Sequence, residues 1–221
     1  MRIGIICSAG GSALLAAAEI CRHVEFRVVT DRPCGVEQGC QRLGLECTRI
    51  PWQDQPKFSA TAHECLDLNG GCDLVVMFFS RLVGRPLVGR QRLLNVHPAL
   101  LPAYPGLRAV ARAQAEGARF LGATLHAADE RMDSGPIVAQ ICQPLRPEWT
   151  AEGAQHVSFL QKTALLLVAI ELTEHGRLDW REGRPILSSG WPINDRFNPA
   201  LTNPRYLDGL RAIQRPGLEL V

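Results

Sequence analysis

Short apolar runs alternate with amphipathic or alanine-rich segments along most of the chain. Residues 2–7 form a β-branched run that ends at a glycine-containing turn, and an alanine- and leucine-rich segment follows at 13–22. This order predicts a strand, a tight turn and a helix. The same alternation predicts further strands at 25–30, 46–50, 73–79, 92–96, 122–127 and 136–142, and further helices at 35–43, 57–68, 107–116 and 151–174.

The run at residues 73–79, DLVVMFF, is almost continuously apolar. Such a run is typical of a central parallel strand with both faces covered. The alternation therefore predicts an α/β fold, with a doubly wound, mostly parallel, Rossmann-like sheet and helices on both faces. After Gly176 the periodicity breaks up among scattered prolines. We expect one domain at residues 1–180 and an irregular C-terminal extension at 181–221, without helical or strand periodicity and without an assigned role.

Composition narrows the class of protein. With 221 residues, 46% hydrophobic and 21% charged, the chain can bury a full core and is not disordered. Its 24 basic and 22 acidic side chains leave a formal charge of +2, which does not favour nucleic acid or a membrane as partner. The longest apolar run, 164–170, is shorter than the roughly 20 residues of a membrane-spanning helix. With no signal peptide evident, we expect a cytoplasmic protein without a membrane span.

The eight cysteines contain no Cys-x-x-Cys pair. A chain of this length does not need disulfides to hold its core, and paired ligands for structural zinc are missing. We therefore expect free thiols and no metal site.

The densest group of candidate functional residues follows the predicted strand at 92–96. Asn95 and His97 are two residues apart at the carboxyl end of that strand, so their side chains project to the same side. Open α/β sheets bind ligands at this edge. Pro102, Pro105 and Gly106 then restrict the following loop. Taken alone, Asn-x-His is also compatible with a polar strand end and a solvated histidine.

A second candidate is Asp133, in the turn between the last two predicted strands. Gly135 and Pro136 follow it. An aspartate in such a turn commonly bonds to its own backbone, so the turn alone does not indicate catalysis.

Three runs of sequence resemble the formyltransferase family. They are RLLNVHPALLPAYPGL at residues 92–107, GATLH at 122–126 and MDSGPIVAQ at 132–140, and a weaker resemblance extends from residue 1 to about 179. The resemblance implies a family member that transfers a formyl group from 10-formyltetrahydrofolate to a primary amine. The expected acceptor is glycinamide ribonucleotide, an intermediate of purine synthesis.

By that resemblance, Asn95, His97 and Asp133 correspond to the family's catalytic residues. Formyl transfer passes through a tetrahedral intermediate with an oxyanion, which an amide N–H and an imidazolium N–H can stabilise. We expect Asp133 to favour the charged form of His97 and to move protons through water. This chemistry requires no metal.

The resemblance also implies a folate pocket. It places Ser80, Arg81, Leu82 and Val83 in the pocket wall, and Ala128, Asp129 and Glu130 in a loop that covers the pterin. For Arg81, contact with the folate glutamate tail and an ordinary surface ion pair remain equal alternatives.

The glycine-containing loop resembles the family segment that holds the phosphate of the acceptor at a helix N-terminus. Its candidate residues are Gly10, Gly11, Ser12 and Ala13. Two positions depart from the family pattern: Ala13 replaces an asparagine, and Lys162 or Gln161 stands where the last long helix carries a glutamate. Lys162 either contacts phosphate or is a solvated helix lysine. The departures favour a different acceptor amine as the first alternative, such as an amino sugar, an amino acid or a natural-product intermediate.

Three further alternatives remain. A formyltetrahydrofolate hydrolase would use water as nucleophile, but Pro98 stands where those enzymes carry a second histidine. A methionyl-tRNA formyltransferase would need a longer, basic C-terminal domain. A non-catalytic folate-binding domain would not need the Asn–His–Asp set. The expected partners are a small-molecule amine and a reduced folate, and the expected assembly is a monomer or homodimer.

Overall fold

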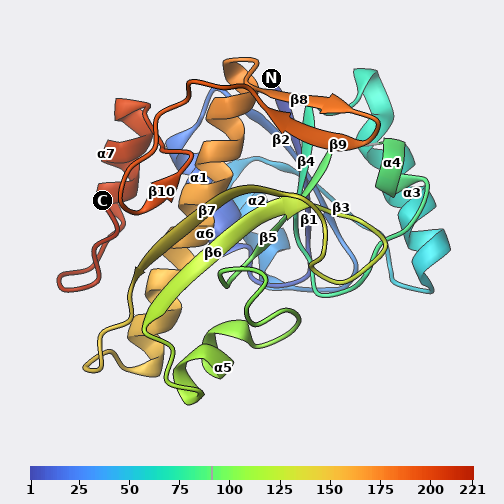
Figure 1. Ribbon diagram of the computed structural model, residues 1–221. Coiled ribbons are helices and arrows are strands. Elements are labelled where there is room, and N and C mark those ends of the chain that lie inside the picture. The colour runs from blue at the N-terminus through green and yellow to red at the C-terminus, as the bar shows by residue number, and fades with distance from the viewer. Residues whose placement is uncertain (91) are drawn as a thin grey trace.

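The computed structural model describes residues 1–90 and 92–221. An eight-stranded sheet forms the centre of the molecule, and a two-stranded hairpin lies beside it (Figure 1). In chain order the elements are β1 (Arg2–Cys7), α1 (Ser12–Ile20), β2 (Glu25–Thr30), α2 (Gly35–Leu43), β3 (Glu46–Arg49), α3 (Gln55–Asp67), the 3-10 turn η1 (Leu68–Gly70), β4 (Leu74–Phe78), α4 (Leu87–Arg90), β5 (Leu93–His97), α5 (Ala109–Ala115), β6 (Phe120–Ala127), β7 (Ile137–Pro144), α6 (Ala151–Glu174), β8 (Leu178–Arg181), β9 (Arg184–Leu187), β10 (Phe197–Asn198) and α7 (Pro204–Ala212).

The sheet has two halves of different direction. The strand order is β10-β7-β6-β5-β4-β1-β2-β3. Five strands are parallel to one another: β3, β2, β1, β4 and β5. The remaining three pair in antiparallel fashion, β6 with β5, β7 with β6 and β10 with β7. The predicted α/β fold with a mostly parallel sheet is therefore confirmed, with an antiparallel addition on one side.

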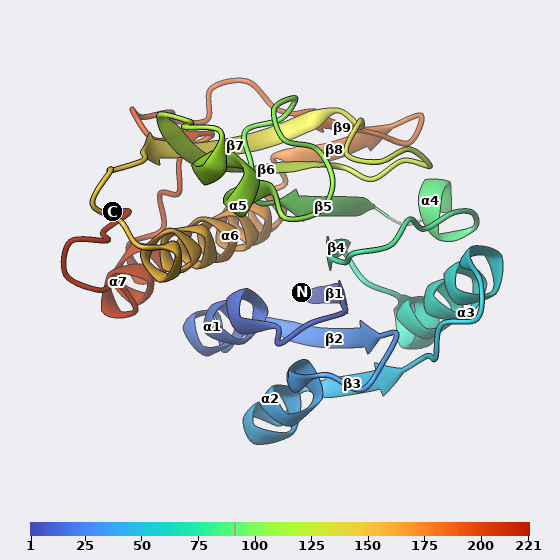
Figure 2. The ribbon, with the colours of Figure 1, turned by 90° about the horizontal axis from the view of Figure 1, so that it is seen from below.

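Helices cover both faces of the sheet (Figure 2). Successive residues of β1 point to opposite faces, as expected of a strand. Ile5 belongs to the larger core cluster, which includes Leu14 of α1 and Leu165 of α6. Ile6 belongs to a second cluster, which includes Phe58 of α3. A strand buried on both sides in this way has no solvent face, which explains its continuous apolar sequence.

The helix α6 is the centre of the larger core cluster, and its bounds agree with the prediction. The Thr150 hydroxyl caps its N-terminus by accepting a hydrogen bond from Gly153 N at 3.1 Å. Among the described residues, α6 is the one helix that is long and apolar enough, by length and composition alone, to cross a membrane. Because 78% of that apolar window is buried inside the protein, it reads here as a core helix.

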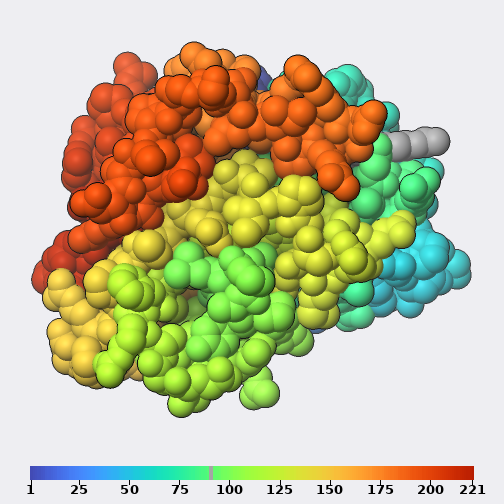
Figure 3. All heavy atoms as spheres, viewed as in Figure 1, coloured from blue at the N-terminus to red at the C-terminus, as the bar shows by residue number. Residues whose placement is uncertain are grey.

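The segment after Gly176 is regular and packed, so the expectation of an irregular tail without helix or strand periodicity is wrong. It forms β8, β9, β10 and α7. Phe197 of β10 pairs with Ile141 of β7, and Tyr206 of α7 donates hydrogen bonds from its hydroxyl to Glu174 of α6, at 3.0 Å. Figure 3 shows this segment, in orange and red, lying against the yellow β7 region. The β8–β9 hairpin spans the proposed boundary at residue 180, which stays a prediction.

Candidate active site

A cavity of about 370 Å³ lies at the carboxyl ends of the parallel strands β1, β4 and β5. This is the edge at which open α/β sheets bind ligands. Four segments and one helix contribute its wall: the glycine loop at 7–14, the segment at 77–83 after β4, the end of β5 with its following loop, the β6–β7 loop, and α6 through Lys162. The structure thus brings nearly all the predicted site residues to one cavity.

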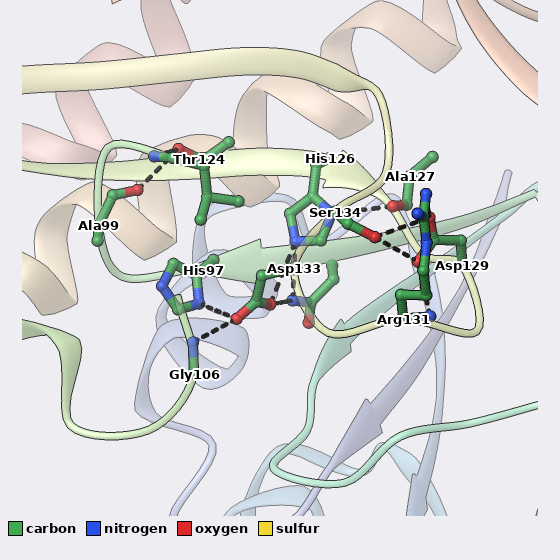
Figure 4. Close-up of polar contacts among 12 residues, drawn as sticks. His97, Ala99, Gly106, Thr124, His126, Ala127, Asp129, Arg131, Asp133 and Ser134 are labelled. Atoms are coloured by element: carbon green, nitrogen blue, oxygen red, sulfur yellow. Dashed lines mark hydrogen bonds and ion pairs between the residues drawn. The ribbon is translucent and has the colours of Figure 1, made fainter. Parts of the chain in front are cut away.

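Asp133 is the centre of the polar contacts in the cavity. Its Oδ2 accepts a hydrogen bond from Gly106 N at 2.7 Å and lies 3.2 Å from His97 Nδ1. Its Oδ1 accepts from Asn95 Nδ2 at 3.3 Å and lies 3.6 Å from His126 Nε2. Figure 4 shows His97, His126 and the backbone of Gly106 around the Asp133 carboxylate. Asn95 and His97, two of the three residues that the sequence selected, therefore both contact the third, Asp133.

The strand register explains this convergence. Asn95 and His97 occupy alternate positions of β5, and both side chains reach Asp133, so the prediction that they share one side is confirmed. In the antiparallel pairing of β5 with β6, Asn95 lies opposite His126 and His97 lies opposite Thr124. The register therefore places His126 beside Asn95 and close to Asp133.

His126 is buried and doubly hydrogen-bonded, as expected of a packed histidine. Its Nδ1 lies 2.8 Å from Ala127 O, and its Nε2 lies 3.1 Å from Asn95 Nδ2. His126 thus orients the Asn95 amide from one side while Asp133 does so from the other.

Burial decides the charge of His97. It lowers the pKa of the imidazole, and the interactions with Tyr104 O, 2.8 Å from Nε2, and with Asp133 oppose that shift without reversing it. His97 is therefore neutral at neutral pH: Asp133 favours the charged form, as expected, but does not outweigh burial. A neutral ring carries one N–H, so it can donate to only one of these two acceptors at a time.

At Asp133, in contrast to His97, the neighbouring groups outweigh the effect of burial on the pKa. Burial works to raise its pKa, but the nearby His126 ring, the Gly106 N–H and the His97 ring outweigh burial and lower the pKa below the ordinary value for aspartate. Asp133 is thus ionised at neutral pH. Its backbone φ of 50° lies in the left-handed region, a conformation that costs an ordinary residue free energy and occurs most often at functional sites.

Most of the predicted folate residues lie in the cavity wall: Ser80, Arg81, Leu82, Val83, Ala128 and Asp129. The Asp129 carboxylate accepts hydrogen bonds from Arg131 N at 2.9 Å and from the Ser134 hydroxyl at 3.0 Å, so it holds the β6–β7 loop in shape. Glu130 does not line the cavity. It lies 3.8 Å from Arg85 in an exposed ion pair.

Arg81 is held by a buried carboxylate. Its Nε lies 2.9 Å from Asp31 Oδ2, and the Asp31 side chain is fully buried. The guanidinium also lies 4.6 Å from the centre of the Trp52 ring, a cation–π contact. The ion-pair alternative for Arg81 is thus present in the structure, and the same side chain lines the cavity.

The glycine loop lines the opposite part of the cavity with Gly10, Gly11, Ser12 and Ala13. Gly11 is the N-cap of α1 with φ of 68°, and no side chain caps the helix there. A Cβ at Gly11 would collide with the Val36 side chain, so both the backbone conformation and the space require glycine. An uncapped helix N-terminus has unpaired N–H groups and the positive end of the helix dipole, and both favour an anion there.

Lys162, rather than Gln161, reaches the cavity. Gln161 is buried on α6 and donates from Nε2 to Leu121 O at 3.0 Å. Lys162 is partly buried in the cavity wall. Burial lowers the pKa of its ammonium, and the neighbouring Cys7 thiol weakly opposes this shift.

Sequence reasoning missed the backbone groups that complete the site. Gly106 N binds Asp133, and Tyr104 O binds His97. Thr124 accepts a hydrogen bond from Leu101 N at 3.0 Å and thereby holds the loop after β5. The Tyr-Pro-Gly run at 104–106 was a signal for this turn, because proline and glycine restrict the backbone, but it does not tell which atoms the turn presents.

Two observations define the class of protein. An Asn–His–Asp cluster lies in a cavity at the carboxyl ends of parallel strands, which is the arrangement of an α/β enzyme active site. A sequence model of the formyl transferase family matches residues 49–168, more than half of the chain, and covers this cluster. The chain belongs to the formyl transferase family.

Individual relatives agree with this assignment. The chain is 35% identical over 139 residues to a phosphoribosylglycinamide formyltransferase of Mycobacterium tuberculosis, covering 61% of each protein. A crystal structure of glycinamide ribonucleotide transformylase 1 from Symbiobacterium toebii matches with a TM-score of 0.77 and 29% identity, over 86% of this chain and 94% of that one. A formyltetrahydrofolate deformylase from Pseudomonas syringae shares the fold at 16% identity, with a TM-score of 0.71.

Proposed function

We propose that the protein transfers the formyl group of 10-formyltetrahydrofolate to a primary amine, with glycinamide ribonucleotide as the acceptor. The observation that carries the proposal is the contact of one ionised carboxylate, Asp133, with both Asn95 and His97 in the wall of the cavity. Relatives with that acceptor in their names support it, as do the family match and the match to a solved transformylase.

The reaction requires groups that stabilise negative charge on the formyl oxygen. The amine nitrogen attacks the formyl carbon, a C–N bond forms, and the carbonyl electron pair moves to oxygen. We assign the binding of that oxyanion to the Asn95 amide and to the N–H of neutral His97. In the free protein the Asn95 Nδ2 contacts Asp133 and His126, so a donated N–H exchanges its protein acceptor for the oxyanion when the substrate binds, while both neighbours keep the side chain in place.

We assign the proton transfers of the reaction to Asp133. The attacking amine must lose a proton, and the departing N10 of the folate must gain one as its bond to the formyl carbon breaks. Asp133 is ionised, so it can accept the first proton, through water, and return a proton to N10. The reaction in this form uses no metal ion.

For the folate, we propose contacts with Ser80, Arg81, Leu82 and Val83 on one side and with Ala128 and Asp129 on the other. A second cavity of about 470 Å³ supports this assignment. It shares Ala128, Asp129 and Arg131 with the first cavity and is also lined by Trp180 of β8. Both cavities thus border the β6–β7 loop, to which we assign the folate.

For the acceptor, we propose the glycine loop, through Gly10, Gly11, Ser12 and Ala13, and Lys162. The uncapped N-terminus of α1 faces this part of the cavity and favours a phosphate. Lys162 also supports the second candidate, a different acceptor amine, because a positively charged lysine stands where the family pattern has a negatively charged glutamate. We place the protein in the cytoplasm, as a monomer or homodimer, with small molecules and not nucleic acid or membrane as partners.

The test is a turnover assay of the purified protein with 10-formyltetrahydrofolate and glycinamide ribonucleotide, following release of tetrahydrofolate. Acceptor-dependent release that is lost in Asp133→Asn supports the proposal. The control variant is Asp208→Asn, which removes an exposed carboxylate of α7 that pairs with its helix neighbour Arg211. Release without amine would identify a hydrolase. Folate binding without release on this acceptor would contradict the proposed acceptor.

A further inference from the structure

Asp31 is a buried carboxylate that the proposed mechanism does not use. It follows β2 directly, and its side chain is fully buried. Two guanidinium groups lie against it: Arg32 donates hydrogen bonds to both carboxylate oxygens, at 2.9 Å and 2.6 Å, and Arg81 Nε lies 2.9 Å from Oδ2. A buried charge is unfavourable unless it is paired, so the two arginines explain how the fold tolerates this carboxylate. They do not yet explain what the carboxylate does.

The two arginines differ in where they lie. Arg32 is the sequence neighbour of Asp31 and lies outside the wall of the main cavity. Arg81 comes fifty residues later, in the segment after β4, and lines that cavity. In the sheet, β1 separates β4 from β2. The ion pair of Asp31 with Arg81 therefore bridges the ends of two strands that are not neighbours, and it connects a buried charge to the cavity wall.

The segment of the cavity wall at residues 80–83 is anchored at both ends by hydrogen bonds from its backbone. At the first end, Ser80 N donates to Ser8 Oγ at 3.2 Å. Just past the other end, Gly84 N donates to the buried Ser59 Oγ at 2.9 Å. These bonds hold the ends of the segment and leave its middle to be fixed by side chains.

The Arg81 side chain fixes the middle of this segment. Its Nε contacts Asp31, and its guanidinium carbon lies 4.6 Å from the centre of the Trp52 ring, a cation–π contact. Trp52 is tied to the same residue, because its backbone N–H donates to Asp31 O at 3.1 Å. Asp31 thus holds Arg81 with its carboxylate and, through its backbone, also holds the residue whose ring the guanidinium contacts.

We propose that Asp31 is a positioning residue for the folate part of the cavity: it fixes Arg81, and through Arg81 the conformation of residues 80–83, before the ligand binds. The proposal rests on the proposed function, which assigns this segment to the folate. A wall that is already ordered loses less conformational entropy on binding. Asp31 therefore contributes to the affinity for the folate without touching it, and takes no part in bond making.

The kinetic test uses Asp31→Asn, which keeps the size of the side chain and removes its charge. KM for the folate should rise about 3- to 30-fold, within the usual range for two side chains in contact, whereas kcat and KM for the acceptor should stay unchanged. Arg32→Met is the matched control, because it removes the other partner of the same carboxylate at a position outside the cavity wall. It should leave KM for the folate unchanged even where it lowers stability to urea. An unchanged folate KM in Asp31→Asn, or an equal rise in Arg32→Met, would overturn the proposal.

A double-mutant cycle tests whether Asp31 acts through Arg81. Arg81→Met should raise KM for the folate, and adding Asp31→Asn to it should cause no further rise, because the side chain that Asp31 positions is then gone. Additive rises from the two substitutions would contradict the proposal, since Asp31 would then act on the folate independently of Arg81.

A fluorescence measurement reports the position of Arg81 without turnover. The chain has four tryptophans, so the emission of Trp52 is taken as the difference between each protein and the same protein carrying Trp52→Phe. Asp31→Asn should shift this emission as Arg81→Met does, because the cation leaves the ring, and Arg32→Met should not. An unshifted emission in Asp31→Asn would overturn the proposal. A shift in a protein that binds no folate would contradict the proposed function and support the positioning of Arg81 by Asp31.

Discussion

The two ends of the cavity differ in how completely the protein satisfies its own polar groups. At the catalytic end, Asp133 contacts Gly106, Asn95, His97 and His126 within 3.6 Å. At the acceptor end, Lys162 meets no carboxylate among the residues that the structure describes, and no side chain caps α1. One end is complete before any ligand binds, and the other is completed by the ligand.

This difference follows from what each end does. Groups that stabilise a transition state contribute most when they are already fixed, because they then need no reorganisation during the reaction. Groups that select a substrate gain affinity when the ligand supplies what the free protein lacks. A dense network and an uncompensated cation are thus expected at the reacting atoms and at the recognition site, respectively.

The largest expected effect is at Asp133. Replacing it with asparagine keeps the shape and a carbonyl acceptor for Gly106 N but removes the proton acceptor, so kcat should fall about 10²- to 10⁴-fold. Folate affinity should change little. Stopped-flow turnover and a fluorescence titration with folate measure the two quantities. A comparable loss of folate affinity would mean that the network serves binding rather than proton transfer.

The next effect is at Asn95. Asn95→Ala removes one oxyanion donor, and the loss of such a donor typically lowers kcat about 10²- to 10³-fold. The same change removes the hydrogen bond to His126, so Asn95→Asp, which keeps the size but not the donor, is the companion variant. Turnover by both variants at saturating substrates compares loss of the donor together with the side-chain volume against loss of the donor alone. If Asn95→Asp retained wild-type kcat, the amide would not be the donor.

A smaller effect is expected at the acceptor end from Gly11→Ala. The left-handed backbone and the collision with Val36 should cost about 1–3 kcal/mol of stability and raise KM for the acceptor, not for the folate. Gly10→Ala is the control for stability, because a Cβ there meets no atom within 4 Å. Urea denaturation of both variants and acceptor kinetics of Gly11→Ala provide the comparison. Equal stability of the two variants would contradict the assigned strain.

The smallest effect is a dependence of stability on pH. Burial lowers the pKa of His97 in the folded state below the ordinary value of about 6.5. The unfolded chain then binds more protons between these two values, so this stability is fully present above about pH 6.5 and is lost as pH falls through the folded pKa. The slope from one histidine is at most about 1.4 kcal/mol per pH unit.

His97→Gln should flatten this slope in urea denaturation between pH 7 and pH 5. His156 is the natural comparison, since burial also lowers its pKa, at a position outside the cavity wall. His156→Gln should remove its own share of the slope and leave the His97 share. A slope unchanged in His97→Gln would show that this ring is already charged in the folded protein.

Local sequence patterns were sufficient for the parallel half of the sheet. The observed bounds of β1, β2, α2 and α6 agree with the predicted ranges, because these elements are apolar or amphipathic runs that end at turn or capping residues. The C-terminal segment was not predicted. Its β10 strand is two residues long and depends on pairing with β7, more than fifty residues earlier, which no local pattern records. The helix α7 did carry a start signal, Asn203 followed by Pro204.

The candidate site also has features that the sequence predicts and features that it does not predict. Asn95, His97 and Asp133 stood out as residue types in distinctive runs, and the structure places them together. The neutral state of His97 could not be predicted, because it depends on how deeply the folded protein buries the ring. Side chains can be recognised from a sequence, whereas desolvation and backbone partners such as Tyr104 O exist only in the fold.

The two outer strands of the sheet have a consequence for self-association. An outer strand with a long row of unpaired backbone groups invites pairing with another chain. At one edge, β3 is four residues long and carries Glu46 and Arg49; at the other, β10 offers two residues and is followed by Pro199, which has no N–H. Neither edge is a good template for a strand from a second molecule, which disfavours edge-to-edge aggregation. A dimer of this protein would have to form through its helices and loops.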